Sequence, residues 1–368
     1  MINEIGYCLE AGGIDMGMTD TEEILHDRLN KIISKLKSSN QSNVVLIGDV
    51  MLDCYIHGFA NNLNSRAPVP VLRETSREED VGAAAHVARG LKSIGFDSKL
   101  YGVVGNDKAG FNIIDLLENE NVNTQGIAII EDRKTTVKTR LLASRESLIQ
   151  GEQLLLRWDV EDDDSIPTEA LSELYNSAIQ NLPNSTCVVM SDYGQGMVYD
   201  EGAEKIGQAA REKNIPIIAD PKLTGLHRTH GVDWIIFQSR GFELMKRRIG
   251  ETTDADAAKS LIENYGWSHL VVLSGGNGVT IYSNDHETVH SQCTLNDLRQ
   301  MIGLIDAAVV AIAFSVSEGL SVEETALLTN AACECILSAE NTESFVISKD
   351  DLINRIGEIA WNLQVSKR

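Results

Sequence analysis

Short apolar runs alternate with helix-like segments along most of this chain. The runs are rich in β-branched residues and are predicted as buried strands; they lie at 44–49, 98–104, 186–190, 216–219, 234–237 and 270–273. Apolar residues recur with a helical period between many of these runs, in the segments 82–94, 167–182, 200–213 and 253–265. Strands and helices that alternate in this way predict an α/β fold, with a mostly parallel central sheet flanked by helices.

The two ends of the chain and two internal stretches depart from this alternation. Residues 1–42 are predicted to form an N-terminal helical extension and linker. The main domain then spans 43–345, and residues 346–368 are predicted as a C-terminal helix packed on it. Within the main domain, β-rich stretches at about 56–78 and 132–158 are predicted to form a small β lid over the site. Such a lid excludes water from the reaction beneath it.

The net charge limits the partners that are expected. The 368 residues carry a formal charge of −22, which disfavours nucleic acid and anionic membranes because both select basic surfaces. No apolar run approaches the roughly 20 residues that cross a bilayer, and the N-terminus lacks the pattern of a secretory signal. Cys333 and Cys335 have no second pair with which to bind zinc. We therefore expect a cytoplasmic protein without a zinc site.

Polar residues at the predicted strand ends are the first candidates for chemistry. Asp49, Asp192, Asp220 and Gly275 each follow a predicted strand. Ligands of parallel sheets bind at the carboxyl ends of the strands, so the site is expected at this edge of the sheet.

Asp306 is the most informative single candidate. It follows a one-glycine turn at Gly303 and opens a long apolar helix. A helix start presents unpaired N–H groups and the positive end of the helix dipole to a phosphate. A carboxylate at the same point takes a proton from an attacking hydroxyl, so the two features together predict a phosphoryl-transfer centre. The alternative is that Asp306 only caps the helix, a role worth about 1 kcal/mol.

Five segments together resemble a known family. They are Gly48-Asp-Val-Met-Leu-Asp53, Ala67-Pro-Val-Pro-Val71, Gly82-Ala-Ala-Ala-His86, Ser191-Asp-Tyr193 and Asp220-Pro-Lys222. Their order and spacing are similar to those of the ribokinase/PfkB sugar kinases, and most closely to heptose-7-phosphate kinase domains of ADP-heptose synthesis. The resemblance implies a ribokinase-like fold and ATP-dependent phosphorylation of a sugar or sugar phosphate, with Mg²⁺ as a cofactor. It also implies a homodimer, because lids of this family often pair between subunits.

The resemblance also implies roles for individual residues. Asp306 is implied as the general base, with Gly303 in the turn that holds the transferring phosphoryl. The residues implied to bind the sugar or its existing phosphate are Asp49, Asp53, Gly82, His86, Lys138, Arg140, Arg157 and Asp192. Those implied to bind the nucleotide are Lys222, Gly275, Gly278 and Asn330, and no residue is assigned to a metal. Lysine and arginine suit phosphate recognition; without the family, the same positions are consistent with ordinary exposed charge and turns.

Two departures from the family pattern leave a second function open. Residues 239–242 read Ser-Arg-Gly-Phe where the family has an Asn-x-x-Glu motif that organises magnesium and phosphate. At the phosphate turn, Gly303 and Asp306 remain, but Gln300 and Ile305 replace the family's aspartate and second glycine. If position 305 needs a left-handed backbone, isoleucine there costs roughly 1–2 kcal/mol. The alternative to an active kinase is therefore a catalytically inactive relative that binds a sugar phosphate or a partner.

Overall fold

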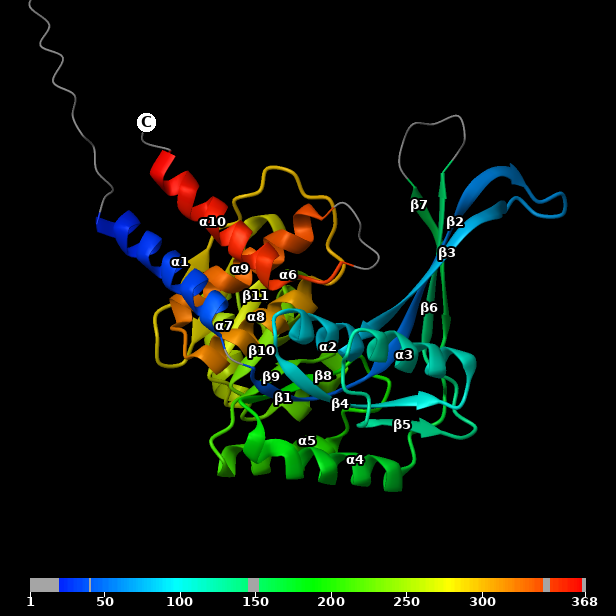
Figure 1. The fold of residues 1–368 in the computed structure, drawn as a ribbon, viewed down its shortest axis with the longest axis horizontal. Helices are drawn as coiled ribbons and strands as arrows, with labels where there is room; N and C mark the ends of the chain where they lie inside the picture. Colours follow the sequence, from blue (N-terminus) through cyan, green and yellow to red (C-terminus); the bar gives the residue numbers. More distant parts are fainter. Residues whose placement is uncertain (1–19, 40, 145–151, 340–344, 366–368) are drawn as a thin grey trace, which may run out of the picture.

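A large, mostly parallel sheet forms the centre of the molecule (Figure 1). The computed structural model describes residues 20–39, 41–144, 152–339 and 345–365, and within them nine strands run in the order β13-β12-β11-β10-β9-β8-β1-β4-β5. Neighbouring strands are parallel, except that β12 is antiparallel to both β11 and β13. The strands are β1 (Asn43–Gly48), β4 (Asp97–Gly105), β5 (Ile127–Ile130), β8 (Cys187–Ser191), β9 (Ile217–Asp220), β10 (Trp234–Gln238), β11 (His269–Leu273), β12 (Val279–Ser283) and β13 (Val289–Ser291). The predicted α/β class is confirmed.

Helices cover both faces of this sheet, each over its own apolar core. One face carries α1 (Asp20–Ser38), α2 (Ala84–Ser93), α3 (Lys108–Asn119), α8 (Leu304–Glu318), α9 (Val322–Ser338) and α10 (Lys349–Val365). The other carries α4 (Thr168–Asn181), α5 (Asp200–Glu212), α6 (Ser239–Ile249) and α7 (Asp254–Tyr265). Short 3₁₀ turns complete the chain: η1 (Leu182–Asn184), η2 (Leu223–Thr229) and η3 (Gly275–Asn277).

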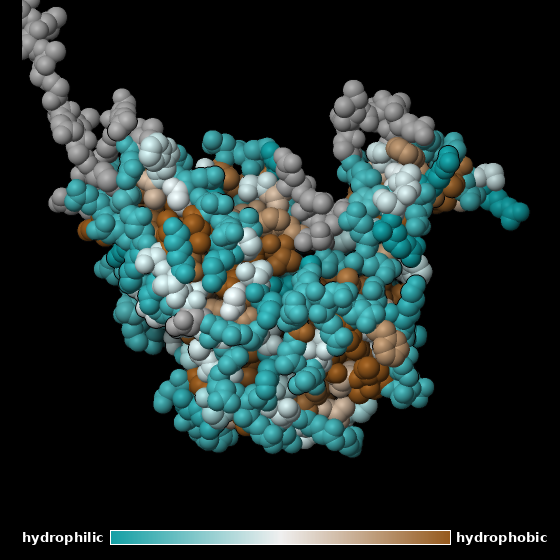
Figure 2. All heavy atoms as spheres, in the orientation of Figure 1, coloured by the Kyte–Doolittle hydropathy of each residue, from teal (hydrophilic) through white to brown (hydrophobic). Residues whose placement is uncertain are grey.

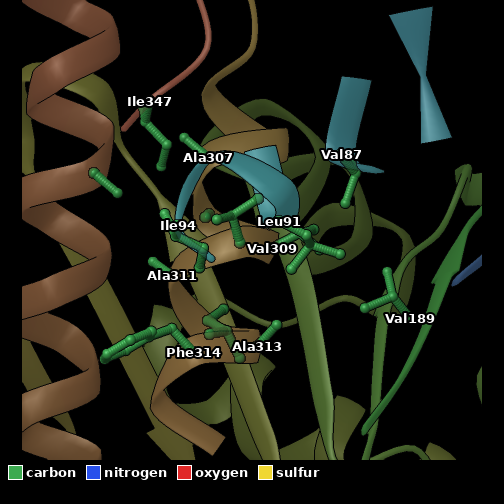
Figure 3. Close-up of a cluster of buried hydrophobic side chains, with 14 of the residues drawn as sticks. Val87, Leu91, Ile94, Val189, Ala307, Val309, Ala311, Ala313, Phe314 and Ile347 are labelled. Atoms are coloured by element: carbon green, nitrogen blue, oxygen red, sulfur yellow. The ribbon is translucent and has the colours of Figure 1, made fainter. Parts of the chain in front are cut away.

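Helix α8 lies inside the first core. It is apolar around its whole circumference, which is the pattern of a helix buried on all sides, and every residue from Ala307 to Ser315 is buried. Figure 3 shows side chains of α8, such as Val309 and Phe314, gathered with Leu91 of α2 and Val189 of β8. Because fully burying one large aliphatic or aromatic side chain contributes about 1.5–3 kcal/mol, this packing fixes the position of the helix start.

Four further strands form a separate sheet that extends from the body as an arm (Figure 1). We call this sheet the lid; it consists of β2 (Val50–Leu63), β3 (Pro70–Ala83), β6 (Val137–Ser144) and β7 (Gln153–Val160), in the order β3-β2-β6-β7. The β2–β3 ladder starts at the pair Val50–Ala83 and continues outward with two register shifts, so the lid strands begin closer to the body than the apolar pattern indicates. Residues 145–151 of the predicted lid lie outside the described part of the chain.

The two terminal helices form an extra layer beside α9. Leu29, Ile32 and Leu36 of α1 are fully buried against the first core. Ion pairs join α1 to its neighbours, with 2.7 Å between Lys31 and Glu324. Residues 1–19 and 366–368 of the predicted terminal segments lie outside the described residues. Among the helices that are described, none has the length and apolarity needed to cross a membrane.

Candidate active site

The crevice between β1 and β8 is where a ligand is expected, because the strand order changes direction there. Asp49 follows β1 and is buried, with an exposed fraction of 2%. Its carboxylate accepts N–H bonds from Tyr193 (2.8 Å), Gln195 (3.0 Å) and Met197 (3.0 Å). Burial raises the pKa of Asp49 although these three donors favour its charged form. Asp49 therefore anchors the loop after β8. It does not line the cavity that contains Asp306.

A cavity of about 330 Å³ lies where the base of the lid meets the body. Figure 2 shows the molecule hollowed between the lid arm and the body. Eight of the residues that the sequence singles out line this cavity: Asp53, Gly82, His86, Lys138, Arg140, Arg157, Gly303 and Asp306. They come from β2, β3, α2, β6, β7 and the entrance of α8, which are far apart along the chain.

The entrance of α8 has the backbone geometry of an anion site. Gly303 is the N-cap residue in a left-handed conformation (φ 80°), and no side chain caps the helix. The N–H groups of the first turn are therefore available to an anion, which the helix dipole also attracts. Ile305 lies within the helix and is not among the positive-φ residues. The left-handed strain considered for position 305 is thus not incurred.

Asp306 faces the cavity from the first turn of α8 and is held by two side chains. His86 Nδ1 lies 2.9 Å from Asp306 Oδ2, and the Tyr193 hydroxyl donates to Asp306 Oδ1 at 3.2 Å. Burial and the charge of Asp306 raise the pKa of Tyr193 well above its usual value, so it acts as a neutral donor. Asp306 is not the cap of this helix; its carboxylate is oriented by two polar neighbours instead.

Three cations of the lid face the same cavity. Arg140 pairs with Asp53 (Nη1 to Oδ1, 2.6 Å) and its guanidinium lies 5.0 Å from the centre of the Tyr55 ring. Lys138 and Arg157 each also have an acidic partner, Glu161 at 3.6 Å and Asp159 at 2.9 Å. The side chains of Lys138 and Arg140 are only 17% and 18% exposed. Such cations retain donors for an anion that enters the cavity.

The junction of β3 and α2 is shaped by two small residues. A Cβ at Gly82 would lie 2.5 Å from Asp53 Oδ2, so only glycine leaves room for that carboxylate. Ala83 follows with a positive φ of 55° and a ψ of −133°, which is outside the usual left-handed helical region. A non-glycine residue in so sparsely populated a region costs roughly 1–3 kcal/mol. This strained junction sets the start of α2 and, through it, the position of His86.

The other predicted site residues lie off this cavity. Asp192 accepts the N–H of Gly194 at 2.8 Å and pairs with Arg228 at 3.4 Å. Lys222 donates to the Tyr193 carbonyl at 3.1 Å.

The predicted nucleotide-binding residues also lie outside the cavity that contains Asp306; they are Gly275, Gly278 and Asn330. Gly275 opens the η3 turn, and a Cβ there would meet Met301 at 3.5 Å. Asn330 is buried in α9 and donates to the Gln292 carbonyl at 3.0 Å. These three residues do not line the cavity that contains Asp306.

Residues 239–243, at the position of the family's Asn-x-x-Glu motif, do not form a metal site. Phe242 is buried and stacks on Tyr282, with ring centres 5.9 Å apart. Glu243, one residue later, pairs with Lys246 at 2.6 Å and Arg247 at 3.1 Å. In the part of the chain that the structure describes, no group of three His, Cys, Asp or Glu side chains is arranged to hold a metal ion. The available donors therefore do not fit a magnesium ion held by the protein alone.

Sequence reasoning did not assign seven residues that line the cavity; three are aromatic, Tyr55, Tyr193 and Phe345, and the others are Met51, Val81, Ala83 and Ile302. Tyr193 lies inside the family-like segment Ser191-Asp-Tyr193, so its position was visible although its contact with Asp306 was not. Tyr55 follows the Gly48–Asp53 segment by two residues, which places it on the same face of β2 as Asp53. Nothing in the local sequence indicates that Phe345 reaches the cavity.

The sequence that forms this fold and lines this cavity matches a known family. The profile described as pfkB family carbohydrate kinase matches residues 41–349. This chain belongs to the pfkB family. Membership makes it a carbohydrate kinase by descent, and the match covers the sheet, the lid and the cavity.

Curated relatives and solved structures agree with this assignment. The bifunctional protein HldE of Koribacter versatilis is 28% identical over 341 residues, covering 92% of this chain and 66% of the relative. HldE of Haemophilus influenzae is 30% identical over 318 residues, covering 86% and 64%. This pfkB chain thus spans about two thirds of the length of these relatives.

Two solved structures show the shared ribokinase-like fold. Phosphofructokinase-2 of Escherichia coli, in complex with potassium, superposes with a TM-score of 0.68 at 17% identity, covering 87% of this chain and all (100%) of that one. Ribokinase of Arabidopsis thaliana, complexed with ribose and ATP, gives 0.66 at 15% identity, covering 86% and 99%.

Proposed function

We propose that this pfkB protein is an ATP-dependent kinase of a phosphorylated sugar of the heptose-7-phosphate type, with Asp306 as the general base. The observation that carries the proposal is that one cavity brings together Asp306, Gly303 and the three lid cations Lys138, Arg140 and Arg157. A base alone fits many acceptors. A base opposite concentrated positive charge, in a chain of net charge −22, favours an acceptor that is itself anionic.

The residues divide into roles by position. The acceptor hydroxyl lies against Asp306, which takes its proton as the hydroxyl oxygen bonds to the terminal phosphorus of ATP. The bond from that phosphorus to the bridging oxygen breaks, and ADP leaves. The N–H groups from Gly303 to Asp306 hold the transferring phosphoryl at the positive end of α8. The lid cations bind the phosphate already on the sugar, and Asp53 binds sugar hydroxyls beside Arg140. Positioning and charge stabilisation supply most of the catalysis of phosphoryl transfer.

The nucleotide is assigned to the side of α8 that carries the η3 turn. Met301, just before the turn at Gly303, lies next to Gly275, so the glycine turn and the start of α8 are neighbours. Lys222, Gly278 and Asn330 are assigned to this nucleotide by family position. Magnesium enters the proposal only as the ion that accompanies ATP, because no group of three His, Cys, Asp or Glu side chains among the described residues could hold it.

A catalytically inactive, sugar-phosphate-binding protein is the second candidate. Two observations favour it: Phe242 is packed in the core where the family has its magnesium-organising acid, and Leu298 closely approaches Gly276 in the η3 turn. Calorimetric titration with Mg-ATP separates the two functions. Micromolar nucleotide binding supports the kinase, whereas binding of sugar phosphate without nucleotide binding supports the second candidate.

The substrate assignment is tested by turnover of ATP with heptose 7-phosphate and with the unphosphorylated sugar. We expect turnover with the phosphorylated sugar only, and Lys138→Met is expected to raise its KM about 10- to 100-fold with little change in kcat. The reason is that a hydrogen bond to a charged group contributes about 1.5–3 kcal/mol. Lys259→Met, which removes an exposed lysine from α7, is the matched control. An unchanged KM in Lys138→Met would contradict the proposal that the lid cations bind the substrate.

We also propose that the lid pairs with the lid of a second copy. Leu156 and Trp158 of β7 are 56% and 61% exposed. Because side chains alternate along a strand, both lie on the face opposite Arg157, which faces the cavity. Figure 2 shows apolar atoms among hydrophilic ones on the lid arm, and exposed apolar groups of this kind mark interaction surfaces.

The pairing is tested by measuring mass in solution with light scattering. We expect the wild type to have twice the chain mass of 40.3 kDa and Trp158→Glu to be monomeric. Trp361→Glu is the control, because Trp361 is similarly exposed (63%) but lies on α10. A monomeric wild type, or a dimer unaffected by Trp158→Glu, contradicts the proposal.

A further inference from the structure

His86 occupies the position for which the resemblance implies a sugar contact, but its ring is bound on both sides within the protein. Nδ1 lies 2.9 Å from Asp306 Oδ2, and Nε2 lies 3.3 Å from the Phe345 carbonyl oxygen. Both neighbours are acceptors. A neutral imidazole has one donor and one acceptor nitrogen, so it satisfies only one of these contacts, whereas an imidazolium donates to both.

We propose that His86 is a positioning residue for Asp306: its imidazolium ties the carboxylate of α8 to the backbone at Phe345 and so fixes the orientation of the base. This inference rests on the proposed role of Asp306. It differs from the sequence-based assignment, in which His86 contacts the sugar. The His86 and Asp306 side chains are only 17% and 12% exposed, which leaves little water to replace either contact.

The charges around His86 come from several elements. Burial by itself lowers the pKa of His86, but the hydrogen bond and the charge of Asp306 outweigh it and raise the pKa. Arg89, on the same helix, opposes this effect, and Asp80 on β3 supports it. Arg89 is itself paired with Asp80 and Glu120, which moderates its influence.

Two further neighbours of the His86–Asp306 pair, Gly303 and Tyr193, are uncharged. A Cβ at Gly303 would lie 3.6 Å from His86 Cε1, so the left-handed turn before α8 leaves room for the ring. Tyr193 holds the other oxygen of Asp306 as a neutral phenol. Asp306 is thus fixed by one charged donor and one neutral donor, and only the charged one titrates near neutral pH.

The direction of the pH effect follows from the raised pKa of His86. The imidazolium is present below that pKa and is lost as the pH rises through it. When it is lost, one nitrogen presents a lone pair to an oxygen, and either Asp306 or the Phe345 carbonyl loses its donor. We therefore expect kcat to fall on the alkaline side of its pH profile, in step with deprotonation of His86.

The experiment has a spectroscopic arm that needs no substrate. The chain has 8 histidines, and the ¹⁵N resonances of His86 are identified as those missing in His86→Asn. In the wild type we expect both ring nitrogens to be protonated below a titration midpoint that lies above the usual histidine value of 6.5. In Asp306→Asn the midpoint should fall below that of the wild type. A His86 titration midpoint at or below the usual histidine value, or one unaffected by Asp306→Asn, overturns the proposal.

The kinetic arm separates positioning from sugar binding. His86→Asn retains a neutral donor near the place of Nδ1 but not the link to Phe345, so kcat at pH 7 should fall less than in His86→Ala and the alkaline limb should disappear. His86→Ala should lower kcat by about 10- to 100-fold, as small misplacements of reacting groups do. A higher sugar-phosphate KM with unchanged kcat and pH profile would instead assign His86 to the sugar and overturn the proposal. If no phosphorylated sugar is turned over, the proposed function fails, and the spectroscopic arm still decides the state of the pair.

Discussion

Asp306→Asn is expected to lower kcat for a phosphorylated sugar by about 10²- to 10⁴-fold, the range that general-base catalysis contributes. Asparagine keeps the size of the side chain but cannot accept the hydroxyl proton. Its amide can still pair with Tyr193, so the cavity should retain its shape. Steady-state kinetics with saturating ATP measures the effect, and calorimetry on the same variant should show sugar-phosphate binding close to that of the wild type.

Asp297→Asn is the matched control for this experiment. It makes the same chemical change in the segment that leads to α8, but Asp297 is 84% exposed and does not line the cavity. We expect its kcat to stay near that of the wild type. Equal rates for Asp306→Asn and the wild type would exclude Asp306 as the base. A loss of sugar-phosphate binding in Asp306→Asn would instead indicate a role in holding the substrate.

Arg355→Met is expected to destabilise the protein by about 3–5 kcal/mol, the usual cost of removing one partner from a buried ion pair. Glu334 of α9 has no exposed side-chain surface, and Arg355 Nε of α10 lies 2.7 Å from it. Arg355 also donates to Thr294 Oγ1 at 2.6 Å, and Glu334 accepts the Thr294 N–H. The methionine variant would leave the Glu334 carboxylate buried without its cation. Urea unfolding followed by tryptophan fluorescence measures the change.

Two further variants show whether the unpaired charge is the cause. Glu358→Gln removes a second, 62% exposed partner of Arg355 and should change stability by less than about 1 kcal/mol. Adding Glu334→Gln to Arg355→Met should recover part of the lost stability, because the buried site then carries no charge. A double variant less stable than Arg355→Met alone would indicate that packing by Arg355, and not charge, dominates.

Much of the fold could be predicted from the sequence because its signals are local. The run at 44–49 and the helical period at 200–213 reappear as β1 and α5 with small changes at their ends. The apolar circumference of α8 likewise identified a helix buried on all sides. The lid was harder to delimit, because β2 begins directly after Asp49 without a turn signal.

The candidate site was only partly predictable, since it depends on contacts between distant segments. Asp49 follows a predicted strand and Asp306 opens a predicted helix. In the structure Asp49 accepts three backbone N–H groups, whereas Asp306 faces the cavity. The difference arises from the path of the loop after β8, which brings its N–H groups to Asp49. The pattern of apolar and polar residues does not predict that path. The contact between His86 and Asp306 joins residues 220 positions apart. The family-like segments gave their positions but not the bond between them.

The pairing of the terminal helices has a practical consequence for studying this protein. Gln364 near the end of α10 lies 2.8 Å from His26 near the start of α1, and both helices are on the side of the body away from the lid (Figure 1). A fluorophore or a surface linker attached to the described part of α1 near His26 or of α10 near Gln364 therefore leaves from the same side of the body. Immobilising the molecule there keeps the arm and the opening beneath it accessible to small molecules in solution.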